Sequence, residues 1–186
     1  MSTELKKSFK EGFLYIPDKV NLAKKEDMII AEGPLGRVQK DFSKVRAFVE
    51  LDGNKVIVRS MGVKRKDKAI VGTCLSLIEN MIKGVTKGFT YKLKIVFAHF
   101  PISIRVKDNE VHIINFIGER APRIAKIIGD TKVRVQGDDL LVYGTDLQAV
   151  SQTAANIEQS TKIKRKDQRV FLDGLFIYEK MEGLPS

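Results

Sequence analysis

Short stretches in which hydrophobic and polar residues alternate occur along most of the chain. Between residues 102 and 107, for example, Ile, Ile and Val alternate with Ser, Arg and Lys. A period of two is typical of a β-strand with one buried face. The turn-forming pair Asp108-Asn109 follows, and a second alternating run extends from Val111 to Phe116. The pattern predicts an antiparallel hairpin centred on this turn.

A similar order of residues occurs 84 positions earlier in the chain. Ile16-Pro17 corresponds to Phe100-Pro101 (101 − 17 = 84), and "LDGNKVIVRS" from Leu51 corresponds to "VQGDDLLVYG" from Val135 (135 − 51 = 84). We expect this register to hold without a gap between the two matched segments. Chance similarity of amphipathic strands could explain one match but explains both poorly. We therefore infer an internal duplication.

Each copy is expected to end in a helix, because apolar residues there recur at helical spacing. The first stripe consists of Ile70, Cys74, Leu77, Met81 and Val85, and the second of Leu147, Val150, Ala154 and Ile157. Thr145 and Gln148 have the spacing of a capping box at the start of the second helix.

These elements predict the α+β class: two tandem duplicated domains, each an antiparallel sheet covered by one helix. We place the N-terminal α+β domain at residues 1–86 and the C-terminal α+β domain at residues 87–186, with the junction near Gly84 to Gly88. The C-terminal domain includes a tail from residue 161 onward that has no counterpart in the first copy.

The charge balance narrows the choice of partner. The 186-residue chain has 33 Lys and Arg against 23 Asp and Glu, a formal net charge of +10. Such a surplus favours a polyanionic partner, through electrostatic attraction and counterion release. An anionic membrane surface is the competing partner, but we find no run approaching the roughly 20 apolar residues of a membrane span. The single cysteine, Cys74, fits a reducing compartment, and we expect a cytoplasmic protein with no membrane contact.

Residues for catalysis or metal binding are few. His99 and His112 are the only histidines, and neither has cysteines or an acidic cluster at metal-ligand spacing. Cys74 is better explained as a buried packing residue than as a nucleophile. The sequence Gly33-Pro34-Leu35-Gly36 lacks the Lys-Ser/Thr of a phosphate-binding loop, and its position between strands favours a hairpin over the GxxG loop of a KH domain. We expect neither an enzyme nor a cofactor.

The basic residues carry more information. A cluster in the tail, interrupted by Asp167, is followed by Gly174 and by the aromatic residues Phe176 and Tyr178; its members are Lys162, Lys164, Arg165, Lys166 and Arg169. Lys and Arg supply phosphate contacts, and an adjacent aromatic ring can stack on an unpaired base. We expect Gly174 to adopt a positive φ in a turn that brings both rings to the nucleic acid. The alternative is a solvated charge run at a helix end.

Two other groups of cations are further candidates for nucleic-acid contact. Lys64, Arg65 and Lys66 precede the first predicted helix, where positive charge opposes the helix dipole. Lys92 and Lys94 lie on a predicted strand. Asp167 and Asp173, among the tail cations, would either orient phosphate groups or repel misplaced ones.

Assembled in order, these segments resemble one family. "GPLGRVQKDF", "NMIKGVTKGFTYKLKIVFAHFPI", "INFIGE" and "FLDGLFIYEK" are similar to the large-subunit ribosomal protein family numbered six in bacteria and nine in eukaryotes, in its archaeal or eukaryotic form. The resemblance extends from about Phe13 to Lys180.

The resemblance implies a structural constituent of the large ribosomal subunit without enzymatic activity. It implies two duplicated α+β domains, binding of large-subunit rRNA chiefly through the C-terminal domain, and neighbouring large-subunit proteins as partners. It also implies a location near the sarcin-ricin loop and the stalk base, where translational GTPases dock. Two other hypotheses are a free-standing RNA-binding regulator and an enzyme that uses His99 with a nearby carboxylate.

Overall fold

The computed structural model describes residues 11–185 except 63, 99, 165, 166 and 168. The chain divides into two compact units between Thr86 and Lys87. Gly88, with a φ of 78°, forms the turn that follows the first helix, a conformation that favours glycine. Each unit has its own core of buried apolar side chains.

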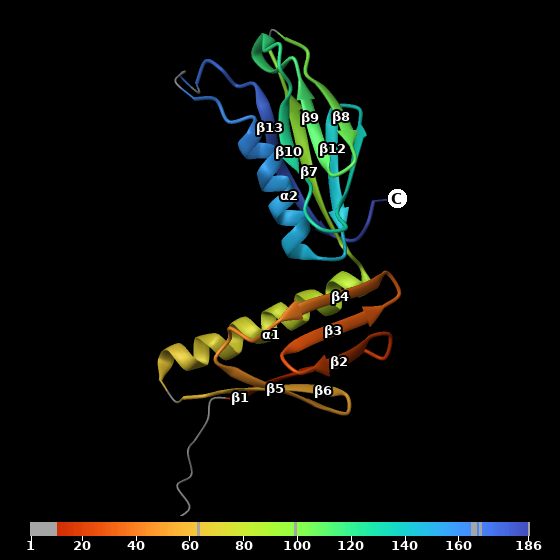
Figure 1. Cartoon of the computed structure of the whole chain (residues 1–186), viewed down its shortest axis with the longest axis vertical. Helices are drawn as coiled ribbons and strands as arrows, with labels where there is room; N and C mark the ends of the chain where they lie inside the picture. Colours follow the sequence, from red (N-terminus) through yellow and green to blue (C-terminus); the bar gives the residue numbers. More distant parts are fainter. Residues whose placement is uncertain (1–10, 63, 99, 165–166, 168, 186) are drawn as a thin grey trace, which may run out of the picture. The chain divides into compact units, whose positions relative to one another are not determined.

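The N-terminal unit contains six strands followed by one helix in its described part (Figure 1). Its strands are β1 (Glu11–Tyr15), β2 (Asn21–Lys25), β3 (Met28–Gly33), β4 (Gly36–Asp41), β5 (Ala47–Asp52) and β6 (Lys55–Ser60), and the helix is α1 (Arg65–Thr86). The strands form two antiparallel three-stranded sheets, in the orders β1-β6-β5 and β2-β3-β4.

The C-terminal unit repeats this plan and adds a strand. Its elements are β7 (Phe89–Val96), β8 (Ser103–Lys107), β9 (Glu110–Ile114), the 3-10 turn η1 (Phe116–Gly118), β10 (Arg123–Lys126), β11 (Lys132–Gln136), β12 (Asp139–Gly144), α2 (Leu147–Ser160) and β13 (Gly174–Glu182). One antiparallel sheet has the order β10-β9-β8 and the other β11-β12-β7-β13. Strand β13 comes from the tail and pairs with β7 at the sheet edge.

The predicted duplication is confirmed by the strand order, because β1-β6-β5 corresponds to β7-β12-β11 and β2-β3-β4 to β8-β9-β10. Helices α1 and α2 both pack against strands of the two sheets in their own unit. The predicted α+β class is therefore confirmed, with the strands of each repeat distributed over two sheets.

The predicted gap-free register is wrong in the first hairpin. The turn at Glu26-Asp27 corresponds to the turn at Asp108-Asn109, so the offset there is 82 residues (108 − 26 = 82). It is 84 at the later hairpin, where Gly53 and Gly137 both adopt a positive φ (137 − 53 = 84). A shift of two keeps every side chain on the same face of the strand, so the alternation in the sequence does not reveal it.

The helices deviate in detail from the predicted stripes. In α1 the buried stripe is centred on Val71, Cys74, Ile78, Met81 and Val85, while Ile70 and Leu77 are only partly buried. The predicted capping box at α2 is wrong: Asp146 is the N-cap, and its carboxylate accepts a hydrogen bond of 3.0 Å from the Gln148 N–H. Asp competes well with Thr for this position.

By length and hydropathy alone, α1 could cross a membrane, which the sequence did not lead us to expect. Its apolar side chains pack into the core of its own unit. This packing is typical of an amphipathic core helix, in which a buried stripe alternates with an exposed polar face.

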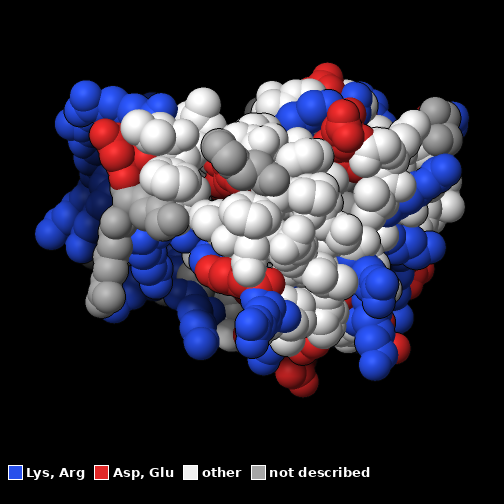
Figure 2. Space-filling view, turned by 90° about the horizontal axis from the view of Figure 1, so that it is seen from above, with Lys and Arg blue, Asp and Glu red and all other residues white. Residues whose placement is uncertain are grey.

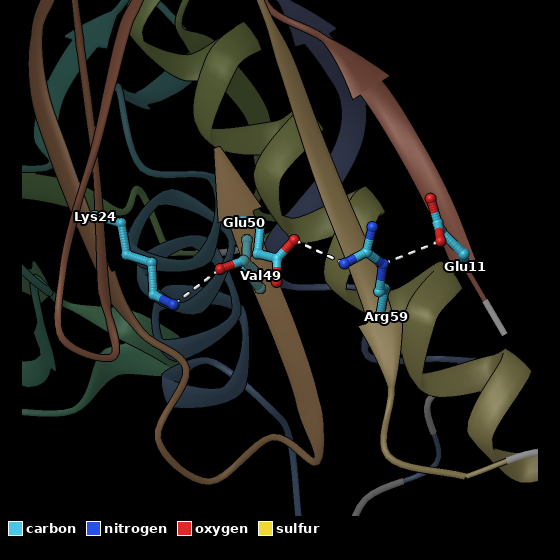
Figure 3. Close-up of polar contacts among 5 residues, drawn as sticks. All are labelled: Glu11, Lys24, Val49, Glu50 and Arg59. Carbon is cyan, nitrogen blue, oxygen red and sulfur yellow. Dashed lines mark hydrogen bonds and ion pairs between the residues drawn. The ribbon is translucent and has the colours of Figure 1, made fainter. Parts of the chain in front are cut away.

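Polar contacts link the strands of the N-terminal unit (Figure 3). The Lys24 ammonium on β2 donates to the Val49 carbonyl on β5, 2.8 Å away, and so links the two sheets. Arg59 on β6 pairs with Glu11 on β1 at 3.0 Å and with Glu50 on β5 at 2.8 Å. The Glu11 hydrogen bond, followed by the charge of Glu50, raises the pKa of Arg59.

Candidate nucleic-acid interface

Residues 161–173 connect α2 to β13 and contain half of the cations predicted to bind nucleic acid; we call them the linking segment. Lys162, Lys164 and Arg169 are exposed, whereas Arg165 and Lys166 lie outside the described residues. Figure 2 shows groups of Lys and Arg side chains on the surface, with Asp and Glu scattered between them. The cationic surface predicted from charge therefore includes at least three accessible side chains in this segment.

The start of the linking segment is held against the core. Ile163 is 9% exposed and belongs to the apolar core of the C-terminal unit. The Thr161 hydroxyl donates to the Glu158 carbonyl at 3.0 Å and accepts from the Leu175 N–H at 3.0 Å. The buried side chain of Ile163 anchors the backbone to the core. Its two sequence neighbours, Lys162 and Lys164, remain exposed to solvent.

Arg123 on β10, distant in the sequence, also bonds to the junction between α2 and the linking segment. Its guanidinium donates to the Ser160 carbonyl at 2.9 Å and makes bonds of 2.9 and 2.6 Å to the Glu119 carboxylate. A cation at the C-terminal end of a helix is stabilised by the helix dipole. The hydrogen bond from Arg123 lowers the pKa of Glu119, so this carboxylate stays charged further into the acid range. We did not identify Arg123 from the sequence, because it lies 37 residues before Ser160.

Asp167 has a local structural role that the sequence left open. Its carboxylate accepts a bond of 2.9 Å from the Arg169 N–H, and its carbonyl accepts from the N–H groups of Val170 and Phe171. These bonds form a turn that displays Arg169, whose side chain is 94% exposed.

The predicted turn at Gly174 is wrong. Gly174 is buried, begins β13 and is absent from the glycines with positive φ. A Cβ atom added to it would lie 3.0 Å from the Phe176 ring, so the missing side chain makes room for that ring. The glycine therefore positions Phe176 by packing rather than through a turn.

Phe176 and Tyr178 are both exposed, as expected for stacking residues, with 46% and 52% of their surface accessible. Phe176 lies opposite Lys94 in the pairing of β13 with β7. The pairing register shifts between Ile177 and Glu179, which leaves Tyr178 in a bulge. Bulges reorient a side chain at a strand edge.

Lys92 and Lys94 are less available than the linking-segment lysines. The Lys92 ammonium lies 2.8 Å from the Glu179 carboxylate, and that hydrogen bond raises the pKa of Lys92. Lys94 lies 3.2 Å from the Asp139 carboxylate. Both charges are thus partly neutralised within the sheet, although Lys94 still borders Phe176.

The predicted cations of the N-terminal unit lie partly inside the helix that they were expected to precede. Arg65 and Lys66 are in the first turn of α1, and Lys64 directly precedes it. The Asp67 carboxylate accepts from the Lys64 N–H at 2.8 Å and places a negative charge at this helix end. All three cations are exposed.

Two exposed apolar residues of the linking segment were missed. Val170 is 71% and Leu172 is 59% exposed. Large apolar side chains this accessible, next to cations, are typical of a contact surface rather than of a solvated charge run. Their signal in the sequence is the apolar run "VFL" directly after the basic cluster.

Within the described residues, no group of three or more His, Cys, Asp or Glu side chains is placed to hold a metal ion. His112 Nε2 lies 3.2 Å from the Glu110 carboxylate, and His99 lies outside the described residues. Burial raises the pKa of the Cys74 thiol, which opposes formation of a nucleophilic thiolate.

The fold and the surface together define a class: a tandem α+β repeat protein with an exposed cationic surface beside exposed aromatic rings, suited to binding a polyanion. Comparison with known families is more specific. The family model described as Ribosomal protein L6 matches residues 16–88 and 100–174, one match in each repeat. The chain belongs to the Ribosomal protein L6 family.

Relatives match over nearly their whole length. The large ribosomal subunit protein uL6 of Staphylothermus marinus is 50% identical over 168 residues, covering 88% of this chain and 91% of the relative. The uL6 of Ignicoccus hospitalis is 48% identical, covering 89% and 91%. That of Archaeoglobus fulgidus is 46% identical over 184 residues, covering 96% and 92%. The family resemblance inferred from the sequence is confirmed.

Proposed function

We propose that this protein is a structural constituent of the large ribosomal subunit, without enzymatic activity, and that it binds large-subunit rRNA mainly through its C-terminal domain. The family and the uL6 relatives support the place in the ribosome. The proposed RNA contact rests on the linking segment. Its cations Lys162, Lys164 and Arg169 are exposed and lie in the same part of the chain as the exposed ring of Phe176.

In the proposed mechanism, the linking-segment cations, with Arg165 and Lys166, neutralise phosphate groups and release their counterions. Phe176 and Tyr178 stack on unpaired bases. This stacking does not depend on the identity of the base, because every base has a π-face. Lys94 and Lys92 add weaker contacts, and Lys64, Arg65 and Lys66 form a second contact from the N-terminal domain. On the resemblance alone, we extend the proposal to a location near the sarcin-ricin loop and stalk base, where translational GTPases dock.

The test is the salt dependence of binding to a fragment of large-subunit rRNA. Each phosphate contact contributes a log–log slope of roughly −0.7 to −0.9, so replacing Lys162, Lys164 and Arg169 by alanine should flatten the slope by about 2 to 3. The matched control replaces Lys19, Lys25 and Arg46, three exposed cations of the N-terminal unit, and should leave the slope nearly unchanged.

Equal slopes for the triple variant and the wild type, with both folded, would refute the proposed surface. Sedimentation distinguishes a ribosomal constituent from a free-standing regulator. The tagged protein should co-sediment with large subunits through a high-salt wash, whereas a regulator should be lost from them.

A further inference from the structure

A groove of about 400 Å³ lies between the C-terminal end of α2 and the start of β13. Its lining includes Lys162, Phe171, Leu172, Asp173 and Phe176. The volume is within the range of roughly 300–1,000 Å³ typical of small-ligand sites, which are mostly apolar with a few polar groups. The groove therefore has the size and character to accept one planar group such as a nucleobase.

Asp173 is the unusual residue in this lining. It is 5% exposed, and no hydrogen bond or ion pair links its side chain to another described residue; its oxygens are not among the fully inaccessible unpaired atoms, so they open onto the groove. Burial of a carboxylate without a partner is costly, and such groups are normally paired. An unpaired acceptor in the wall of a groove suggests that a ligand supplies the missing donors.

The other walls favour a flat ligand. The Phe176 ring packs against Gly174, and this contact holds the ring in position. Phe176 nevertheless remains 46% exposed. A planar group can stack on the accessible part of the ring. Lys162, on the same groove, provides a cation for a phosphate attached to that group.

Guanine fits this combination better than the other bases. Its Watson–Crick edge has two adjacent donors, N1–H and the N2 amino group, and the two oxygens of one carboxylate can accept both side by side. Adenine and cytosine each offer a single amino group next to an acceptor nitrogen, and uracil offers one N–H between two carbonyl oxygens. A cationic side chain of a neighbouring protein could also pair with Asp173, but Lys162 in the same lining repels a cation and attracts a phosphate, and the other acid of the lining, Glu158, already accepts from the Ile177 N–H.

We propose that this groove binds an unpaired guanine of the RNA, with Asp173 accepting from its Watson–Crick edge, Phe176 stacking on its face and Lys162 contacting its phosphate. The inference rests on the proposed RNA-binding function and adds base specificity to it. Asp173 thereby acts as a specificity-determining residue rather than as a repellent of phosphate.

The test measures binding of the full chain to labelled hexanucleotides by fluorescence anisotropy. We expect 5′-UUUGUU-3′ to bind about 5- to 150-fold more tightly than the versions with A, C or U at the fourth position, as for a bidentate base contact. Inosine at that position lacks the N2 amino group and should weaken binding about tenfold or more, because one hydrogen bond to a charged acceptor is lost. This comparison requires no protein variant.

Two variants test the assigned roles. Asp173→Asn should remove the preference for guanine over inosine. Phe176→Leu should weaken all hexanucleotides alike. Equal binding of the guanine, inosine and uridine hexanucleotides by the wild type would overturn the inference, as would a preference that survives in a folded Asp173→Asn protein.

The two proposals fail in different ways. If the hexanucleotides bind equally but the triple alanine variant flattens the salt slope, only the guanine site is refuted. If that variant leaves the slope unchanged, the proposed RNA surface itself is refuted.

Discussion

Cys74 and Asp173 are both almost inaccessible to solvent, but their surroundings differ. The Cys74 side chain is 0% exposed among apolar residues of α1 and the sheets, where a thiol packs as a small hydrophobe. Asp173 lines a groove, and no hydrogen bond or ion pair links its side chain to another described residue. At the scale of single residues, the same degree of burial thus reflects packing for Cys74, whereas for Asp173 it supports the proposed guanine contact.

We predict that Cys74 reacts slowly with a thiol reagent in the native protein. Burial blocks access and raises the pKa of the thiol, so that little thiolate forms at neutral pH. Labelling by a chromogenic disulfide should be far slower than in the urea-denatured chain. Similar rates in the two states, with the native protein shown to be folded, would contradict the assigned burial.

At the scale of elements, β13 joins the tail to the C-terminal sheet. As an edge strand it has one row of backbone groups that β7 does not pair, and exposed edges of this kind promote aggregation. Side chains from the end of α2 satisfy part of this row. The Ile177 N–H donates to the Glu158 carboxylate at 3.0 Å, and the Leu175 N–H donates to the Thr161 hydroxyl at 3.0 Å. Helix and strand together therefore fix both ends of the linking segment.

We predict that Thr161→Val lowers the free energy of unfolding by about 1 to 3 kcal/mol. The substitution keeps the shape of the side chain but leaves the buried Leu175 N–H without its acceptor. Urea denaturation followed by circular dichroism measures the change. Thr73→Val is the matched control, since Thr73 is exposed and bonds only within α1; its effect should stay within about 0.5 kcal/mol. Equal losses for the two variants would argue against a stabilising hydrogen bond from the Leu175 N–H to the Thr161 hydroxyl.

At the scale of the whole molecule, each unit has its own core and its own helix spanning two sheets. The ends of the C-terminal unit are joined by its own contacts: the Gly183 N–H donates to the Gly88 carbonyl at 2.9 Å, and Lys87 lies 3.2 Å from Glu182. A cut between Thr86 and Lys87 leaves these contacts intact. We therefore propose the two units as separate folding domains.

Fragments 1–86 and 87–186, produced separately, should each unfold in one cooperative transition in urea. Fragment 87–186 should retain most of the rRNA affinity and most of the salt slope of the full chain. Absence of a cooperative transition in either fragment would show that the domains depend on each other. Tight rRNA binding by fragment 1–86 alone would move the main RNA contact to Lys64, Arg65 and Lys66.

The sequence alone predicts the duplication, the two helices and the hairpins at Asp108-Asn109 and at Gly33–Gly36. These features depend on local periodicity and turn chemistry, which a single chain displays directly. It also determined which cations are candidates for RNA contact, since charge is a property of composition. Three features became visible only in the folded chain: β13 pairs with β7, Arg123 bonds to the end of α2, and Asp173 is buried in the same groove lining as Phe176. These features depend on contacts between distant parts of the chain or on the packing around one side chain. Long-range contacts and packing leave no periodic signal in the sequence. Gly174 illustrates the difference: its permissive backbone suggested a turn, whereas the packing of Phe176 against it decided its role.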